Sequence, residues 1–347
     1  DGGGPLGQEG RMSQPAAGAD KLNVALLASA LAPQLSPQSL LRQNEPLANR
    51  TTLRVGGPAD LYVEPATEPD LAAVLRFCAE RQLPWFVLGR GSNLLVKDAG
   101  FRGVVVCLAQ PFFSRIEVMG SPKAETELKE ELPAPSGLGR NPKVQLCCGA
   151  GAKLKAVANE ARRHALTGLE FLEGIPGSVG GALRMNAGAM GAATFEVVDS
   201  VRLMDVNGQV RECQPAQLAV AYRSCSTLKD HIALSALLSG CSGVSAMIEQ
   251  RMHEFSQKRW KSQPAAPSAG CMFKNPAAIP AGKLIEELGL KGTRVGGAMV
   301  SHEHGNFLVN DAGATARDFL ELIAVIRQKA RAERGIELET EVQIIGE

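Results

Sequence analysis

The sequence of 347 residues predicts a mixed fold, in which two α/β units precede a C-terminal α+β unit. Three observations support this prediction. Residues 61–108 show strand, helix and strand patterns with a glycine loop, an order typical of nucleotide-binding α/β units. A second glycine-dense segment covers 168–191. From about residue 244 long helical patterns surround an antiparallel-looking strand, so the architecture changes there.

The first half of the chain contains the clearest elements. Its first helix is amphipathic, with Leu71, Val74, Leu75 and Cys78 at helical spacing. In chain order we predict strand 61–65, helix 68–82, strands 84–89 and 100–108, a strand and turn over 144–151, and helix 152–166. Residues 119–143 are charged, rich in Pro and Ser and without periodicity, which is typical of a surface insertion.

The second half continues with a hairpin over 197–213, where Asn207-Gly208 predicts a type I′ turn. We then predict a helix through 247–260, a strand at 306–310, a long helix at 313–334 and a last strand at 337–346. The expected division is an extension at 1–40, disordered or forming a short helix, α/β units at 41–112 and 113–243, and a C-terminal unit at 244–347.

Composition and charge exclude several functions. The 37 basic and 36 acidic residues leave a net charge of +1, so we expect neither a nucleic-acid surface nor one for anionic membranes. The apolar stretch within 21–41 is interrupted by Pro33 and is too short to span a bilayer. Eight cysteines without CxxC spacing favour reduced thiols in a cytoplasmic protein over a secreted disulfide framework.

The loop GRGSNLLV follows a predicted strand. Gly89 and Gly91 permit unusual backbone conformations, and Ser92 and Asn93 add polar side chains. Successive backbone N–H groups in such a loop suit a diphosphate, although an ordinary tight turn is the better explanation of the loop taken alone. The loop is not a Rossmann-type G-x-G-x-x-G, because no third glycine follows, and GxxxxGK[ST] is absent from the sequence.

The segment GIPGSVGGA, continued by Asn186 and Gly188, strengthens that interpretation. Two glycine segments at strand ends can hold one long dinucleotide from both sides. The chain has only 15 aromatic residues, which suits a cofactor held by backbone rather than by stacking. A glycine-rich joint between domains is the alternative.

Seven segments now show a family resemblance. They are NRTTLRVGGPAD, VLGRGSNLLV, GLEFLEGIPGSVGGALRMNAGAMG, AYRSCS, SAGCMFKNP, AGKLIEELGLKGTRVGGAMVSHEHGNFLVN and ELETEVQIIG. In this order they resemble the UDP-N-acetylenolpyruvoylglucosamine reductases (UDP-N-acetylmuramate dehydrogenases), in their shorter form, from about Asn44 to Glu347. The resemblance implies a vanillyl-alcohol-oxidase-type fold, in which two α/β subdomains bind FAD non-covalently and a C-terminal domain binds substrate.

The implied reaction belongs to peptidoglycan precursor synthesis. NADPH supplies a hydride through FAD to the enolpyruvyl ether of UDP-N-acetylglucosamine, giving UDP-N-acetylmuramate. We expect a cytoplasmic monomer without nucleic-acid partners or membrane insertion. The residues implied to contact FAD are Gly89, Arg90, Gly91, Ser92, Asn93, Leu94, Gly174, Ile175, Pro176, Gly177, Ser178, Gly180, Gly181, Asn186 and Gly188.

Three residues match the family's active-site positions. Arg223 in AYRSCS would hold the substrate carboxylate, and Cys271 stands where the family most often has a proton-donating serine. Glu341 matches the family's third active-site residue, a glutamate near the C-terminus. Glu339 is an alternative to Glu341. The residues implied to contact substrate are Tyr222, Lys274 and Asn275.

Other interpretations remain open. Arg223 could form a structural ion pair, Cys271 a small buried thiol and Glu341 a solvated carboxylate. The pattern His302-Glu303-His304 offers no third metal ligand at convincing spacing, so we predict no metal. A flavoprotein oxidase of the same fold is the competing enzyme, and a non-catalytic nucleotide-binding scaffold is the competing binding protein.

Overall fold

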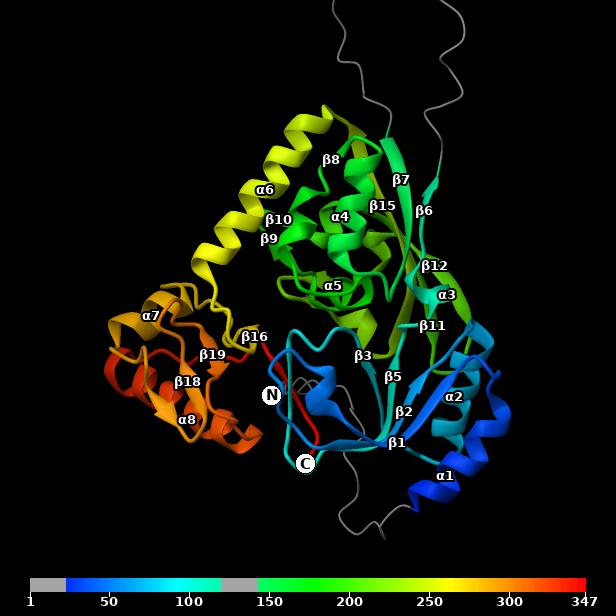
Figure 1. The fold of residues 1–347 in the computed structure, drawn as a ribbon, viewed down its shortest axis with the longest axis horizontal. Coiled ribbons are helices and arrows are strands. Elements are labelled where there is room, and N and C mark those ends of the chain that lie inside the picture. Colours follow the sequence, from blue (N-terminus) through cyan, green and yellow to red (C-terminus); the bar gives the residue numbers. More distant parts are fainter. Residues whose placement is uncertain (1–22, 120–142) are drawn as a thin grey trace, which may run out of the picture.

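The computed structural model describes residues 23–119 and 143–347. The predicted tail at 1–20 and all but the two end residues of the predicted insertion lie outside these ranges. Three groups of elements follow one another along the chain (Figure 1): a small sheet near the N-terminus, a larger antiparallel sheet, and a C-terminal sheet with two helices.

The first sheet has the strand order β1-β2-β5-β3. Strands β2 (Pro58–Glu64), β5 (Phe101–Cys107) and β3 (Trp85–Leu88) are parallel, and β1 (Leu40–Pro46) is antiparallel to β2. Helix α2 (Glu68–Glu80) begins with a capping box between Thr67 and Asp70, while α1 (Val24–Leu31) buries Ala28 and Leu31. Central β5 buries consecutive valines, as expected of a strand covered on both faces.

The second sheet is antiparallel, in the order β12-β11-β15-β7-β6, and β8 pairs with the end of β15. Its strands are β6 (Ile116–Met119), β7 (Lys143–Gly149), β8 (Leu166–Thr167), β11 (Val198–Asp205), β12 (Val210–Cys213) and β15 (His231–Ser242). The helices in this part are α3 (Pro111–Ser114), α4 (Leu154–Arg163) and α5 (Val179–Met185), with the 3-10 helix η4 (Glu170–Gly174). Two short hairpins complete it: β9 (Gly188–Ala189) with β10 (Ala192–Ala193), and β13 (Val220–Ala221) with β14 (Ser224–Cys225).

Helix α6 (Ser245–Ser262) runs along one side of the molecule to the C-terminal part (Figure 1). There, strands β16 (Ser268–Cys271), β17 (Arg294–Val295), β18 (Ala298–Val300) and β19 (Phe307–Asn310) pair in the order β16-β19-β18-β17. Helices α7 (Ala281–Glu287) and α8 (Ala316–Arg334) pack beside them. No helix in the described ranges is long and apolar enough to cross a membrane.

One strand pair links the two ends of the chain. Strand β4 (Leu94–Val96), directly after the first glycine loop, pairs in parallel with the last strand, β20 (Gln343–Ile345). The C-terminal segment therefore returns to the first glycine loop and is held there by main-chain hydrogen bonds.

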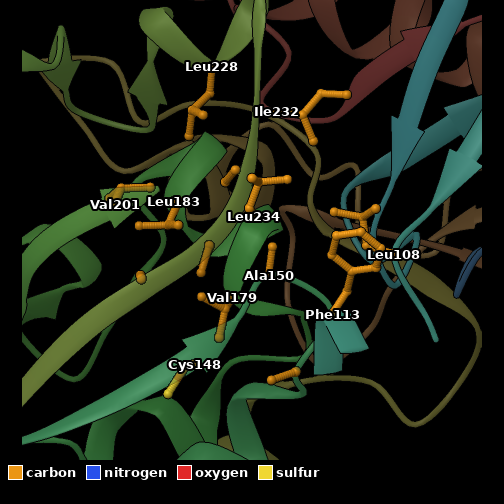
Figure 2. Packing of buried hydrophobic residues seen from close by; sticks show 14 of the residues in the cluster. Leu108, Phe113, Cys148, Ala150, Val179, Leu183, Val201, Leu228, Ile232 and Leu234 are labelled. Atoms are coloured by element: carbon orange, nitrogen blue, oxygen red, sulfur yellow. The ribbon is translucent and has the colours of Figure 1, made fainter. Parts of the chain in front are cut away.

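The largest core cluster joins the first two sheets. Figure 2 shows part of it, where Val179 and Leu183 of α5 lie near Leu234 of β15, and Leu108 and Phe113 extend the cluster toward the first sheet. A second cluster lies between α7, α8 and the C-terminal strands, and includes Leu53 and Leu95 from the first part. Burial thus fixes the C-terminal part against the glycine loop as well as within itself.

Three sequence predictions need correction. Residues 179–185, for which no helix was predicted, form α5, which is capped by the Ser178 side chain. The 205–210 turn is not type I′, because Gly208 has a positive φ of 82° and Asn207 does not. The last strand covers only Gln343–Ile345, so Glu339 and Glu341 lie before it in an irregular segment.

Candidate active site

Arg223 and Glu341 form an ion pair between distant parts of the chain. Arg223 lies in the β13–β14 turn, with a left-handed φ of 55°. Its Nε atom is 3.0 Å from Glu341 Oε1, and both side chains are largely buried. The two groups are not aligned for a hydrogen bond, and Nε has no hydrogen-bond partner among the described residues. The guanidinium therefore retains donors for an anionic ligand.

The second glycine segment positions this arginine. A Cβ atom on Gly188 would lie 3.3 Å from Arg223 Nη1 and 2.8 Å from a neighbouring main-chain oxygen. Asn186 adopts a left-handed conformation at the end of α5, and its Nδ2 donates to Ala221 O at 3.2 Å. Asn186 and Gly188, expected to contact the cofactor, thus lie beside the arginine.

The first glycine loop and β16 position Glu341. Its main-chain N–H donates to Met272 O at 2.8 Å, and its main-chain oxygen accepts from Asn93 Nδ2 at 3.2 Å. Burial raises the pKa of the Glu341 carboxyl, and the Arg223 charge opposes this effect. Glu339, the alternative candidate, is exposed and pairs with Lys274 instead.

Cys271 ends β16 and is half-buried. Burial, with the Glu341 charge, raises the pKa of its thiol to about 11, while the Arg223 charge and a hydrogen bond with Asn306 act in the opposite direction. The thiol therefore carries its proton at neutral pH. The structure brings Arg223, Cys271 and Glu341 into one electrostatically coupled group, although they come from three separate elements.

Asn306 is a member of this group that the sequence analysis did not single out. Its side chain is 2% exposed and bonds the main chain of Phe273 twice: Phe273 N–H donates to Oδ1 at 2.9 Å and Nδ2 donates to Phe273 O at 2.8 Å. Met272 N–H also donates to Asn306 O at 2.7 Å. Asn306 thus fixes the two residues after Cys271. The available signal was its place in HGNFLVN, as the first residue of the predicted strand 306–310.

The three predicted substrate residues differ in their surroundings. Tyr222 is 60% exposed, and its ring lies 5.2 Å from Arg223 Cζ. Lys274 Nζ is 2.9 Å from Glu339 Oε2. Its charge also opposes, to a small extent, the rise in the pKa of Glu341 that burial causes. Asn275 Oδ1 accepts from Ala281 N–H at 3.0 Å, so it caps the start of α7 in this structure.

The predicted cofactor residues meet at a cavity of about 650 Å³. Gly89, Arg90 and Ser92 of the first glycine loop line it together with Pro176 of the second. A Cβ on Gly89 would lie 2.9 Å from Ser178 Oγ, so the two loops touch where glycine is needed. Gly270, directly before Cys271, lines the same cavity, so the cavity reaches the residue next to the thiol.

Other predicted cofactor residues do not line this cavity. Gly180 packs against Ala150, where a Cβ would approach to 3.1 Å, and Gly181 N–H receives the Ser178 cap at 3.4 Å. Leu94 is buried in β4. The remaining positions, Gly91, Asn93, Gly174, Ile175 and Gly177, belong to the two loops without lining the cavity.

The cavity wall also contains residues that the sequence analysis missed. Arg50, Arg54, Arg259 and Trp260 all line it. Arg50 and Arg54 stand in the segment NRTTLRVGGPAD, to which no role was given, and Arg259 and Trp260 lie outside the quoted segments. Only the fold brings the four side chains to one surface. The positive charge of the three arginines suits phosphate groups.

Metal ligation receives no support from the His302-Glu303-His304 loop. Ser301 Oγ bonds Glu303, and His304 Nδ1 accepts from Asn306 N–H at 3.1 Å. Within 23–119 and 143–347, no group of three His, Cys, Asp or Glu side chains could hold a metal ion.

Comparison with known proteins first defines the class. The FAD binding domain family matches residues 59–129 and 135–214, which include both glycine segments. Together with the cavity between these segments, the match defines the chain as an FAD-binding oxidoreductase.

The particular family follows from the rest of the chain. Residues 263–345 match the C-terminal domain of UDP-N-acetylenolpyruvoylglucosamine reductase. The reductase of Pelobacter propionicus is 42% identical over 314 residues, covering 90% of this chain and 98% of the relative. That of Heliobacterium modesticaldum is 41% identical, covering 88% and 90%.

A solved structure agrees. The UDP-N-acetylenolpyruvylglucosamine reductase of Thermus caldophilus has a TM-score of 0.70 and 35% identity, covering 89% of this chain and 99% of that one. The chain belongs to the UDP-N-acetylenolpyruvoylglucosamine reductase family of peptidoglycan precursor synthesis. The predicted fold class, family and enzyme class are confirmed.

Proposed function

We propose that the chain reduces the enolpyruvyl ether of UDP-N-acetylglucosamine to the lactyl ether of UDP-N-acetylmuramate, with NADPH as reductant. The observation that carries this proposal is the Arg223–Glu341 pair beside the protonated Cys271 thiol, next to the glycine-lined cavity. FAD, when bound, supplies the hydride that it has received from NADPH. The eight free thiols fit a reducing cytoplasm.

The cavity fits FAD. Gly89, Arg90, Ser92 and Pro176 would hold its diphosphate region, because bare backbone at the two loops allows close approach and Arg90 adds positive charge. The substrate's diphosphate would be met by Lys274 after it leaves Glu339, with Tyr222 at the rim.

Arg223 binds the substrate carboxylate in this proposal. Hydride addition to the methylene carbon leaves negative charge on the neighbouring carbon, and this charge spreads into the carboxylate. A guanidinium held by Gly188 and Glu341 meets that charge without reorganising.

Cys271 completes the reduction by donating its proton to the neighbouring carbon. The hydride and this proton together saturate the carbon–carbon double bond, and the thiolate takes up a proton from water afterwards. A pKa of about 11 keeps the thiol protonated before the reaction, and the nearby Arg223 charge stabilises the thiolate formed.

Glu341 positions Arg223. Its carboxylate faces the same region as the developing charge, so its negative charge has to be neutralised by the guanidinium or by a proton. The raised pKa of the buried carboxyl lowers the cost of protonation.

The test is optical. Under anaerobic conditions, NADPH should bleach the absorbance of bound flavin, and UDP-N-acetylglucosamine enolpyruvate should restore it. Bleaching without recovery would overturn the substrate assignment and leave the flavin intact. Recovery with oxygen alone, at a catalytic rate, would indicate an oxidase, and a protein unable to take up FAD would overturn the cofactor as well.

A further inference from the structure

Trp260 is a large apolar side chain that is exposed at the wall of the cavity. Its side chain is 72% exposed, more than the other exposed large apolar side chains in the described part of the chain. Nevertheless it lies on the wall of the 650 Å³ cavity, in the last turn of α6. An indole on a concave surface offers a flat apolar face to a ligand.

The residue before the tryptophan attaches the end of α6 to the rest of the cavity wall. Arg259 Nε donates to Gln263 Oε1 at 3.2 Å, and Arg259 Nη1 lies 3.5 Å from Gly174 O, in the second glycine segment. Burial lowers the pKa of Arg259, and the charge of Glu173 opposes this effect. The end of α6 is therefore attached to the second glycine segment, which fixes the main chain at Trp260 beside the cavity.

Two cationic side chains face the same space. Arg54 and Arg90 both line the cavity, and neither takes part in an ion pair within the residues that the structure describes. Arg54 also has a left-handed φ of 58°, a conformation that a non-glycine residue adopts only when its surroundings impose it. A cavity with one flat aromatic wall and two unpaired arginines matches a ligand that combines a base with phosphates.

We propose that Trp260 stacks on the adenine ring of a dinucleotide in this cavity, while Arg54 and Arg90 contact its phosphates. The inference rests on the proposed use of FAD and NADPH, which share the adenine and diphosphate chemistry. Glu64, also at the cavity wall, is already engaged by Tyr62 Oη at 2.8 Å, by Arg50 and by Gln110 Nε2, so it takes no part in the proposed contacts.

The first experiment measures binding. Trp260→Leu keeps an apolar side chain but removes the ring, and Trp260→Phe restores a smaller ring. Loss of base stacking should weaken dinucleotide binding about tenfold in the leucine variant and less in the phenylalanine variant. Met247→Ala, an exposed residue of the same helix outside the cavity lining, is the matched control and should bind as the wild type.

Two arms distinguish the sources of adenine. If Trp260 stacks on FAD, the leucine variant should release FAD more readily on dilution of the holoenzyme, with unchanged affinity for NADP⁺. If it stacks on the nicotinamide dinucleotide, FAD retention should be unchanged while NADP⁺ binds about tenfold more weakly.

Fluorescence gives a readout that does not depend on Trp260 variants folding. The chain has two tryptophans, so the Trp85→Phe holoenzyme reports Trp260 alone. NADP⁺, which does not accept energy from indole, should quench this emission in the second arm only. Unchanged FAD retention, unchanged NADP⁺ affinity and no quenching would together overturn the proposal. Neither measurement uses the UDP-linked substrate, so failure of the proposed reduction would be seen separately.

Discussion

At the scale of single residues, Cys271 decides the second half of the proposed reaction. Cys271→Ala removes the proton donor, so substrate-dependent flavin reoxidation should slow by about 10²–10⁴-fold. Cys271→Ser retains a hydroxyl at the same place and should keep turnover. Flavin reduction by NADPH should be unaffected in both variants. Anaerobic stopped-flow absorbance measures the two half-reactions separately.

The pH dependence gives an independent check of the same residue. A thiol with a pKa of about 11 donates its proton below that pH and cannot above it, so the wild-type reoxidation rate should fall as pH approaches 11. The serine variant should lack this alkaline decrease. Full reoxidation in Cys271→Ala would show that another group supplies the proton.

Asn306 should act on the same half-reaction from a distance. Asn306→Ala leaves Phe273 N–H and C=O unpaired in a buried position, which should cost about 1–3 kcal/mol of unfolding free energy. Because β16 then loosens at Cys271, reoxidation should slow and the substrate KM should change little. Asn310→Ala, which removes comparable main-chain contacts at the far end of β19, is the control for stability. Equal slowing in both variants would reduce Asn306 to a structural residue.

At the scale of elements, the sequence correctly predicted those helices and strands whose formation is determined by a local residue pattern. Helix α2 has both an apolar face and a capping box, and β5 has its valine run, so both are visible in one window of sequence. Helix α5 was missed because glycines hide a helix of seven residues whose stability comes from burial of Val179 and Leu183. The 205–210 turn was misassigned because Asp205 Oδ1 accepts from two main-chain N–H groups, and the turn closes with Gly208 N–H donating to Asp205 O.

The first glycine loop yields the element-scale prediction. Gly91 has a φ of 63°, and a Cβ there would lie 2.3 Å from Arg50 O. Gly91→Ala should therefore both strain the loop and force it away from Arg50, weakening FAD binding and lowering unfolding free energy by more than about 1 kcal/mol. Gly335 has the same φ of 63°, but a Cβ there would meet no atom within 4 Å, so Gly335→Ala isolates the backbone strain.

Calorimetry with FAD fluorescence measures both effects of Gly91→Ala. We expect the holoenzyme melting temperature to fall further for Gly91→Ala than for Gly335→Ala, and free FAD to appear only in the former. Equal decreases would mean that the close approach to Arg50 relaxes without cost.

At the scale of the whole molecule, the active site exists only through long-range pairing. Arg223, Cys271 and Glu341 were identified one at a time by family resemblance, while no window of sequence shows that β20 returns to β4 or that Asn93 bonds Glu341. The same holds for Trp260, Arg54 and Arg90, which meet at the cavity from three separate segments. Contacts of this kind depend on the packing of complete elements, which local periodicity does not specify.

The buried thiols make the stability of the whole molecule sensitive to alkali. Cys78 and Cys148 are fully buried, and burial raises the pKa of each to about 12. Unfolded thiols titrate near pH 8.5, so below that pH both states keep their protons and stability is unaffected. Above pH 8.5 the unfolded chain loses its thiol protons while the native state keeps them. The unfolded state then binds fewer protons than the native state, so the free energy of unfolding falls as pH rises toward 12.

Urea unfolding at about pH 8 and about pH 10, in reducing buffer, measures this effect. Over that interval the two thiols together should remove about 4 kcal/mol of unfolding free energy from the wild type, a loss that Cys78→Ala/Cys148→Ala should not show. The double variant will start lower at pH 8, because two side chains are truncated in the core, but its pH dependence should be shallower. Lysines and tyrosines titrate in both proteins alike, so they cancel in the comparison. Parallel decreases in the two proteins would place the alkaline sensitivity elsewhere and remove the buried thiols as its cause.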